Sequence, residues 1–282
     1  MPNARSGPAM ETVNGIFYLA GGNNGGDTAN LQAYDPTTNQ WTTLANMPAG
    51  RYSGDGAGVI NSQLYVAGGW TISPPLPHNS LFVYDPASNT WMAKASLSHL
   101  SACGATGVIK SKLYVTTACD GFSGYRNLLD VYDPLTDSWA SLAGSLSAHG
   151  GPAAGVINDK LYVAGGNNGV TGITNVLEVY DPATNTWTKL APMRVAVINS
   201  ASVALNGKLY VFGGNNGTAD VSTVQVYDSH TNKWTILTPS MPTARNSASA
   251  AMAYGIVFVD GGSNSSGILT TNEEFIIGPS IP

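Results

Sequence analysis

Short apolar segments and polar loops alternate along the whole chain, and this alternation itself recurs at a nearly fixed spacing. In residues 160–187 the apolar run LYVAGG is followed by a polar loop, an alternating run that ends at Tyr180, and Trp187. Six copies of this unit lie 47 to 50 residues apart. A unit repeated at such a period indicates a repeat architecture, in which each copy buries its apolar surface against its neighbours.

Each copy predicts four strands. The first segment is rich in Gly, Ala and Ser, which suits an innermost strand crowded around a central axis. The second is continuously apolar and predicts a strand buried on both faces. Pairs such as Asn158-Asp159 and Asn206-Gly207 predict a two-residue hairpin turn between the two. The third strand alternates, and a turn containing Asp-Pro connects it to an outermost strand that begins with Trp, a side chain large enough to fill the widest gap between neighbouring sheets.

Three signature positions recur from copy to copy, and we expect structural roles for them. A Gly pair ends the second strand, an aromatic residue ends the third, and the Trp follows seven residues later. The Gly pairs are Gly21-Gly22, Gly68-Gly69, Gly165-Gly166, Gly213-Gly214 and Gly261-Gly262, with Thr117-Ala118 in the third copy. The aromatic residues are Tyr34, Tyr84, Tyr132, Tyr180, Tyr227 and Phe275. The Trp residues are Trp41, Trp91, Trp139, Trp187 and Trp234.

This combination of Gly pair, Tyr and Trp resembles the kelch repeat, and the resemblance covers essentially the whole chain. It implies an all-β, six-bladed β-propeller with four-stranded antiparallel blades around a channel. We expect a single domain over residues 1–282. Its predicted blades span approximately residues 4–46, 47–96, 97–144, 145–192, 193–240 and 241–282.

The sixth predicted blade is incomplete. The position where Trp is expected after Phe275 is Pro282, the last residue, so we expect this blade to lack its outer strand. Either the blade has three strands, or the sequence is a domain cut from a longer protein. The second interpretation is favoured, because an exposed edge strand without a protecting residue is an aggregation hazard.

Composition narrows the classes of partner. Only 10% of the residues are charged and the net charge is −5, which argues against a nucleic-acid or anionic-membrane surface. No apolar run approaches the roughly 18 residues that a membrane span needs. The chain is rich in Thr, Asn and Ser and poor in Lys, as in secreted bacterial kelch modules, which slightly favours an extracellular or cell-surface location. We expect a monomeric domain.

The candidates for metal or redox chemistry are weak. Cys103 and Cys119 fall on one predicted hairpin, where only a bulge would bring them face to face, so separate thiols are favoured over a disulfide. The Asn-Asn-Gly triplets that begin at Asn23, Asn167 and Asn215 lack the clustered carboxylates that Ca²⁺ favours, and turn chemistry explains them better. We expect no metal and no cofactor.

Copper-radical oxidases of the galactose-oxidase type also use a kelch-like propeller. That resemblance implies Tyr ligands, two His ligands and a Tyr–Cys crosslink. The four His residues of this chain lie in three different strand or loop contexts: they are His78, His99, His149 and His230. A copper enzyme is therefore a remote alternative.

The loops between second and third strands vary most, and a rigid framework with variable loops places recognition on that face. Trp70, His78, Tyr125 and Arg126 break the repeat within these loops. Two roles are open for Trp70: an exposed platform for a sugar or a peptide, or packing between blades.

Arg5, Arg51 and Arg245 lie at or next to the start of predicted innermost strands. Many eukaryotic kelch domains carry Arg there, and some use it to grip acidic peptides, so the resemblance makes these residues candidates for ligand binding. Capping of local carbonyl groups is the structural alternative. Leu100 and Ala148 interrupt any basic ring in blades three and four.

Two acidic residues occupy unusual positions, but we assign no catalytic residue. Asp55 falls in a predicted innermost strand and is a candidate to face the channel, whereas Asp260 precedes a Gly pair and suits a hydrogen-bonded structural acid. We predict a non-catalytic binding module for a protein or glycan ligand. The alternative is a sugar-processing enzyme resembling kelch-type sialic-acid epimerases (mutarotases). Arg, acid and His side chains converging at one channel mouth would favour the enzyme, and loops that merely present aromatic rings would favour the binding module.

Overall fold

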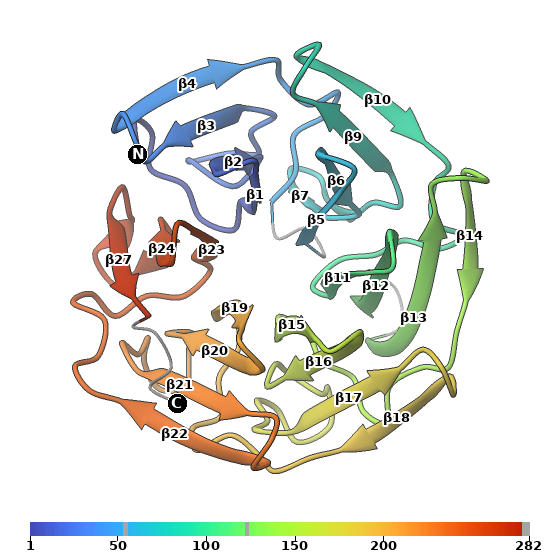
Figure 1. Ribbon diagram of the computed structural model, residues 1–282, viewed down its shortest axis with the longest axis vertical. Helices are drawn as coiled ribbons and strands as arrows, with labels where there is room; N and C mark the ends of the chain where they lie inside the picture. The colour runs from blue at the N-terminus through green and yellow to red at the C-terminus, as the bar shows by residue number, and fades with distance from the viewer. Residues whose placement is uncertain (53–55, 122–123, 278–282) are drawn as a thin grey trace.

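A computed structural model describes residues 1–52, 56–121 and 124–277, and within them every regular element is a β-strand. Six antiparallel sheets stand in a ring around a central channel, as Figure 1 shows. In each sheet the first strand in sequence lies innermost, and the later strands follow toward the rim. The ring confirms the six-bladed propeller expected from the repeat.

Blades one to five have four strands each. Blade one contains β1 (Ala9–Val13), β2 (Ile16–Ala20), β3 (Leu31–Asp35) and β4 (Gln40–Leu44). Blade two contains β5 (Gly56–Ile60), β6 (Gln63–Ala67), β9 (Leu81–Asp85) and β10 (Thr90–Lys94). Blade three contains β11 (Ala105–Ile109), β12 (Lys112–Cys119), β13 (Tyr125–Asp133) and β14 (Ser138–Ser141). Blade four contains β15 (Ala153–Ile157), β16 (Lys160–Ala164), β17 (Leu177–Asp181) and β18 (Thr186–Lys189). Blade five contains β19 (Ala201–Leu205), β20 (Lys208–Phe212), β21 (Val224–Asp228) and β22 (Lys233–Leu237).

Within the described residues, blade six has three strands. They are β23 (Ser249–Ala253), β24 (Ile256–Asp260) and β27 (Asn272–Ile276). Residues 278–282, including Pro282 at the expected Trp position, lie outside the described part of the chain. Two small hairpins project from loops: β7 (Trp70–Ile72) with β8 (Pro75–Pro77), and β25 (Ser263–Asn264) with β26 (Gly267–Ile268).

The predicted hairpin turns are present between first and second strands. Ile157 pairs with Lys160, and the two turn residues, Asn158 and Asp159, have φ of 52° and 58°. Both angles lie in the left-handed region that a two-residue hairpin turn of this kind requires. In blade one, β1 begins at Ala9. The residues just before it form a linker, in which the Gly7 N–H donates to the Ser247 carbonyl of blade six.

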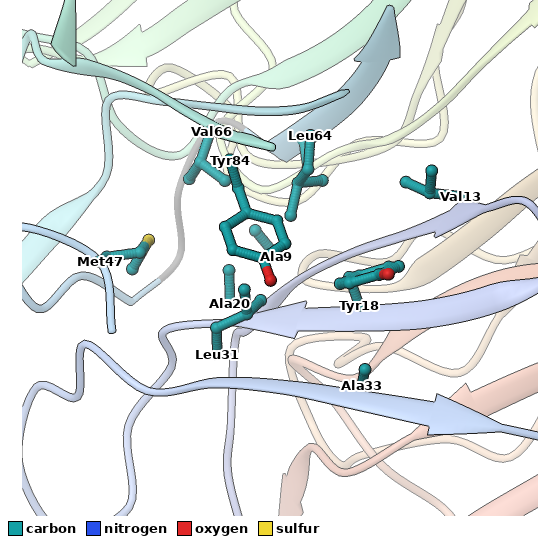
Figure 2. Packing of buried hydrophobic residues seen from close by; sticks show 11 residues of the cluster. Ala9, Val13, Tyr18, Ala20, Leu31, Ala33, Met47, Leu64, Val66 and Tyr84 are labelled. Carbon is teal, nitrogen blue, oxygen red and sulfur yellow. The ribbon is translucent and has the colours of Figure 1, made fainter. Parts of the chain in front are cut away.

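Neighbouring blades pack through their apolar faces. Between blades one and two, Tyr18 and Leu31 face Val66 and Tyr84, as Figure 2 shows, and the Tyr18 and Tyr84 ring centroids are 5.8 Å apart. Each blade therefore depends on the next to bury one face of its sheet, which is the physical reason for the repeat.

A repeated hydrogen-bond motif, which we call the Trp staple, joins the outer strands. The indole N–H of a Trp donates to the carbonyl of an Ala at the end of the preceding blade's outer strand, and the N–H of that Ala donates to the Asn or Asp two residues before the Trp. The Trp–Ala pairs are Trp91–Ala45, Trp139–Ala95, Trp187–Ala143 and Trp234–Ala191, with distances of 2.7–2.8 Å. The side-chain acceptors are Asn89, Asp137, Asn185 and Asn232. The Trp residues therefore both fill the space between blades and link the blades.

The Gly pairs are explained by a close approach of the chain. In blade four Gly165 has φ of 70°, and a Cβ added to it would lie 2.6 Å from the carbonyl oxygen of Val197. The N–H of Gly166 donates to that same oxygen at 2.8 Å. Val197 belongs to the linker that enters blade five, so the Gly pair lets this linker cross directly over the end of β16.

Candidate binding site

A cavity of about 760 Å³ opens at the end of the channel where the loops between second and third strands meet the linkers between blades. We call this cavity the cup. All six blades contribute to its wall, mostly through Gly, Ala, Ser and exposed backbone. Three aromatic residues of the described ranges also line it: Tyr52, Trp70 and Tyr125. Loops carried on a closed ring of sheets thus form a concave surface of fixed shape.

Trp70 reaches the cup because of a local pairing with the linker into blade two. The backbones of Tyr52 and Trp70 exchange two hydrogen bonds of 2.9 and 3.0 Å. The small β7–β8 hairpin begins at Trp70, directly after the Gly68-Gly69 pair, and pairs it with Pro77. Tyr52 and Trp70 are therefore held next to each other on the blade-two side of the cup, and both remain partly exposed.

Tyr125 reaches the cup because blade three lacks the Gly pair. Without it, β12 continues to Cys119, which pairs with Tyr125 at the start of an extended β13. The Tyr125 ring lies against blade four, where a Cβ on Gly150 or Gly169 would come within 2.2 or 2.7 Å of ring atoms. The replacement of a Gly pair by Thr117-Ala118 thus places an aromatic ring in the wall of the cup.

The two cysteine residues also line the cup. Cys103 and Cys119 form no disulfide. Ala102 pairs with Cys119 across an isolated bridge, and Cys103 adopts a left-handed φ of 62°. The cup therefore combines aromatic rings, thiols and small side chains.

Glu11 is a cup residue that the sequence analysis did not single out. It is the third residue of β1, where β5, β11 and β15 have Gly58, Gly107 and Gly155. Burial raises the pKa of Glu11 to about 7, although a backbone hydrogen bond from Thr12 opposes the shift. The sequence could have revealed Glu11, because an acidic residue stands at a repeat position that three other copies fill with Gly. Tyr52 carried no such signal, because its place depends on the pairing with Trp70.

Two of the three candidate arginines are buried structural residues. Arg5 and Arg245 are both fully buried. The Arg5 guanidinium donates to the Gly21 carbonyl at 3.2 Å and to Gln32 Oε1 at 2.7 Å. Arg245 donates to the Gly261 carbonyl and forms an ion pair with Glu273. Neither guanidinium is open to a ligand, and both perform the capping role that was the alternative expectation.

The other three candidates lie outside the cup wall. Arg51 is half-buried and donates to the Gly50 carbonyl at 2.7 Å. His78 Nε2 lies 3.2 Å from Thr71 Oγ1, and burial followed by the charge of Arg51 lowers the pKa of this imidazole. Arg126 is exposed and forms a 2.7 Å ion pair with Asp120. Of the seven candidates, the structure brings only Trp70 and Tyr125 together at the cup.

Of the two acids at unusual positions, the structure describes Asp260 but not Asp55. Asp260 is fully buried, but within the described part of the chain neither carboxylate oxygen has a hydrogen-bond partner, so the expectation of a hydrogen-bonded structural acid is wrong. Burial raises the pKa of Asp260 to about 7, against the opposing charges of the N-terminus, Arg245 and Arg5. Asp55 lies outside the described residues.

The histidines are distributed among different blades. His149 and His99 each lie on the linker that enters a blade and contact a buried acid on the third strand of that blade. His149 Nε2 lies 3.6 Å from Glu178, and His99 Nε2 lies 3.2 Å from Asp130. His78 and His230 lie elsewhere. Within the described ranges, no group of three or more His, Cys, Asp or Glu side chains is placed to hold a metal ion.

The fold and the cup define a propeller with a concave cavity built from loops and linkers. The sequence profile of the attractin/LZTR1 β-propeller family matches residues 17–268. The chain therefore belongs to this family of β-propellers, and its kelch-named relatives confirm the kelch repeat. None of the described residues forms a helix that could span a membrane.

Individual relatives match over part of their length. Alpha-scruin of Limulus polyphemus is 32% identical over 108 residues, which cover 36% of this chain and 11% of that protein. Kelch-like protein 15 of Danio rerio is 42% identical over 60 residues, covering 21% of this chain and 10% of the relative. The chain thus spans only about a tenth of these two proteins. The solved structure of YjhT superposes with a TM-score of 0.85 over 99% of this chain and 97% of that one, at 19% identity, and so shares the fold.

Proposed function

We propose that this chain is a non-catalytic binding module that receives a loop of a partner protein in the cup, with a glycan as the alternative ligand. The observation that carries the proposal is the cup itself, a 760 Å³ hollow built from variable loops and lined by Tyr52, Trp70 and Tyr125. Large concave surfaces with aromatic residues are typical of ligand sites. A kelch propeller is by its fold suited to protein interaction.

Exposed apolar side chains around the cup favour a protein ligand. They belong to the loops and linkers of blades two to four: Ile72, Leu76, Tyr125, Leu146 and Val170. Leu146 is 62% exposed and Val170 90% exposed. Apolar side chains gathered on one face mark surfaces that another protein covers, whereas a glycan site needs polar groups beside its aromatic platform. An extracellular or cell-surface location remains a proposal that rests on composition.

The cup gives less support to the sugar-acid enzyme. An acidic sugar needs a cation in its site, and no Arg, Lys or His lines the cup among the described residues. The arginines that could have converged there are buried in the blade framework or lie outside the cup. The cup wall combines aromatic rings with the carboxyl group of Glu11 but no cation among the described residues, which favours the binding module over the enzyme.

The test is a paired screen of peptide-display and glycan libraries with the wild-type protein and two variants. Trp70→Ala removes the aromatic platform from the cup, and Leu135→Ala is the matched control. Leu135 is 91% exposed but lies in the turn between β13 and β14, at the opposite end of the blade. We expect a ligand whose affinity falls at least about tenfold in Trp70→Ala and is unchanged in Leu135→Ala.

The two libraries separate the ligand classes. Peptide hits that depend on Trp70 support the protein-binding module, and glycan hits with the same dependence assign the cup to carbohydrate. Hits that ignore Trp70, or a folded protein that binds neither library, would count against the cup as the recognition site.

A further inference from the structure

We propose that the cup selects a cationic group, an amine or a guanidinium, and that the Glu11 carboxylate is the residue that pairs with it. This inference deepens the proposed function and rests on the cup being the ligand site. It concerns the chemistry of the ligand group that enters the cup, whether that group is a Lys or Arg side chain of a partner protein or a small polyamine.

The position of Glu11 carries the inference. The cup wall reaches only the second residue of the other innermost strands, such as Ala57 in β5 and Thr106 in β11, but in β1 it reaches Glu11, the third. Glu11 therefore lies at the base of the cup. It remains partly exposed there, its carboxylate accepts a backbone hydrogen bond from Thr12, and it forms no ion pair with the described residues. An acid at the bottom of a cavity without a cationic partner is suited to a counter-ion supplied by a ligand.

The surroundings of Glu11 are apolar. In blades two and three the equivalent position is Gly, because Val and Leu side chains of the next blade would lie 2.7–2.8 Å from an added Cβ. By the equivalence of the repeats, Val59 and Leu64 of blade two occupy the corresponding positions next to β1. Such an environment disfavours an unpaired charge, and burial accordingly raises the pKa of Glu11 to about 7.

Among the residues that the structure describes, no Arg, Lys or His lines the cup and competes for Glu11. Tyr18 lies opposite it on β2, and Tyr65 is the titratable residue of β6; burial raises the pKa of both phenols, so they stay neutral. The described residues of β5 and β23 carry no titratable group. Asp55, just before β5, lies outside the described residues. With Glu11 below, the rings of Tyr52, Trp70 and Tyr125 can contribute cation–π attraction above.

Linkage gives the proposal a pH signature. A bound cation stabilises the ionised carboxylate, so at pH values below about 7 the ligand must first drive off the Glu11 proton. Affinity for a cation should therefore rise with pH and reach a plateau above that value. A neutral ligand of the same shape should show no such dependence.

The experiment measures binding by NMR titration with three probes of matched backbone. They are the amides of Nα-acetyl-lysine, Nα-acetyl-norleucine and Nα-acetyl-glutamate, of which only the first carries a free side-chain ammonium group. We expect the lysine probe to bind about tenfold more tightly than the norleucine probe at about pH 8, and to lose most of that advantage at about pH 5.5. The glutamate probe should bind most weakly. Spermidine and a Gly-flanked lysine peptide then distinguish a small polyamine from a polypeptide as the source of the cation.

Glu11→Gln provides the matched variant, because the amide mimics the protonated acid. It should remove the lysine preference and its pH dependence while leaving the norleucine affinity unchanged. Should this variant fail to fold, the pH profile of the wild-type protein decides the matter alone. Probes that bind in a Trp70-dependent way without preferring a cation would overturn the role of Glu11 but leave the binding module intact. Binding of no probe, or equal binding by all three without dependence on Trp70, would contradict both.

Discussion

At the scale of single residues, the free-energy cost of burying a charged side chain depends on which groups lie beside it. Arg245 and Glu273 are both buried and paired, so each charge is compensated. Asp260, which on β24 follows Val259, the partner of Glu273, is equally buried, but neither of its oxygens has a hydrogen-bond partner among the described residues. The same strand end is Ala20 in blade one and Ala67 in blade two, so the repeat has a small apolar side chain at this position.

Asp260→Asn should stabilise the protein at alkaline pH. The carboxyl loses its proton near pH 3.8 in the unfolded chain but only near 7 in the folded protein, so the folded state binds more protons between these values. Stability must therefore fall as pH rises through this window and stay low above it. We expect the variant to unfold with a free energy on the order of 2 kcal/mol greater than wild type at about pH 8, and with a small difference at about pH 4, measured in urea.

Glu274→Gln is the control for this prediction, because Glu274 lies on β27 of the same blade and is exposed. It should change the unfolding free energy little at either pH. A destabilised Asp260→Asn protein at pH 8 would show that the carboxylate has a compensating partner in solution.

At the scale of elements, the outer strands are held by hydrogen bonds from the next blade rather than by strand pairing alone. Trp139 contacts Tyr132 within its own blade, with ring centroids 5.2 Å apart, and donates to Ala95 of the preceding blade at 2.7 Å. Trp41 of blade one has the same intra-blade contact, with Tyr34 at 4.9 Å. Its indole N–H, however, has no acceptor among the described residues, because the preceding blade is blade six. Trp139 and Trp41 therefore differ mainly in whether the indole N–H takes part in the Trp staple.

Trp139→Phe should therefore cost more than Trp41→Phe. Both changes remove similar ring volume, but only the first leaves the Ala95 carbonyl without its donor. We expect a difference of about 1 kcal/mol in the free energy of unfolding by chemical denaturation. Truncation of Trp139 to Ala should cost about 3 to 5 kcal/mol, because the ring fills the space between blades.

Equal costs for the two Phe variants would mean that the indole hydrogen bond contributes nothing to blade association. A Trp139→Ala change that costs less than about 1 kcal/mol would contradict the wedge role itself.

At the scale of the whole molecule, the ring closes between its last and first blades through the inner part of the structure. The N-terminal amine donates to the Thr270 carbonyl at 3.0 Å, and the Arg5 carbonyl accepts the Gly262 N–H at 3.0 Å. These contacts reproduce the linker contacts of the other blades. The outer part differs: β27 pairs with β24 alone among the described strands, whereas β21 of blade five lies between β20 and β22.

Blade six should consequently be the most labile part of the propeller. Backbone amides of β27 should exchange with solvent faster than those of β21, because one edge of β27 lacks a neighbouring strand within the described residues. Native-state hydrogen exchange followed by mass spectrometry or NMR measures this difference. Equal protection of the two strands would show that the outer edge of blade six is covered in solution.

Much of the architecture was predictable because it is local and repeated. The Gly-pair, Tyr and Trp positions predicted the number of blades, and the two-residue turn pairs predicted the strand register of each inner hairpin. The candidate site was less predictable. Trp70 and Tyr125 were found because they break the repeat. Arg5 and Arg245 were misleading, because their side chains are buried against backbone carbonyls and residues of the third strand.

The sequence by itself determined the ring, since a strand that is apolar on both faces must be covered by a neighbour on each side, and six copies supply those neighbours. Only the tertiary structure decided which side chains meet at the channel mouth. Glu11 and Tyr52 belong to the cup because linkers far apart in sequence converge there, and burial on the ring axis sets the pKa of Glu11. Local sequence specifies local backbone geometry, whereas the environment of a charge depends on groups that only the closed ring brings together.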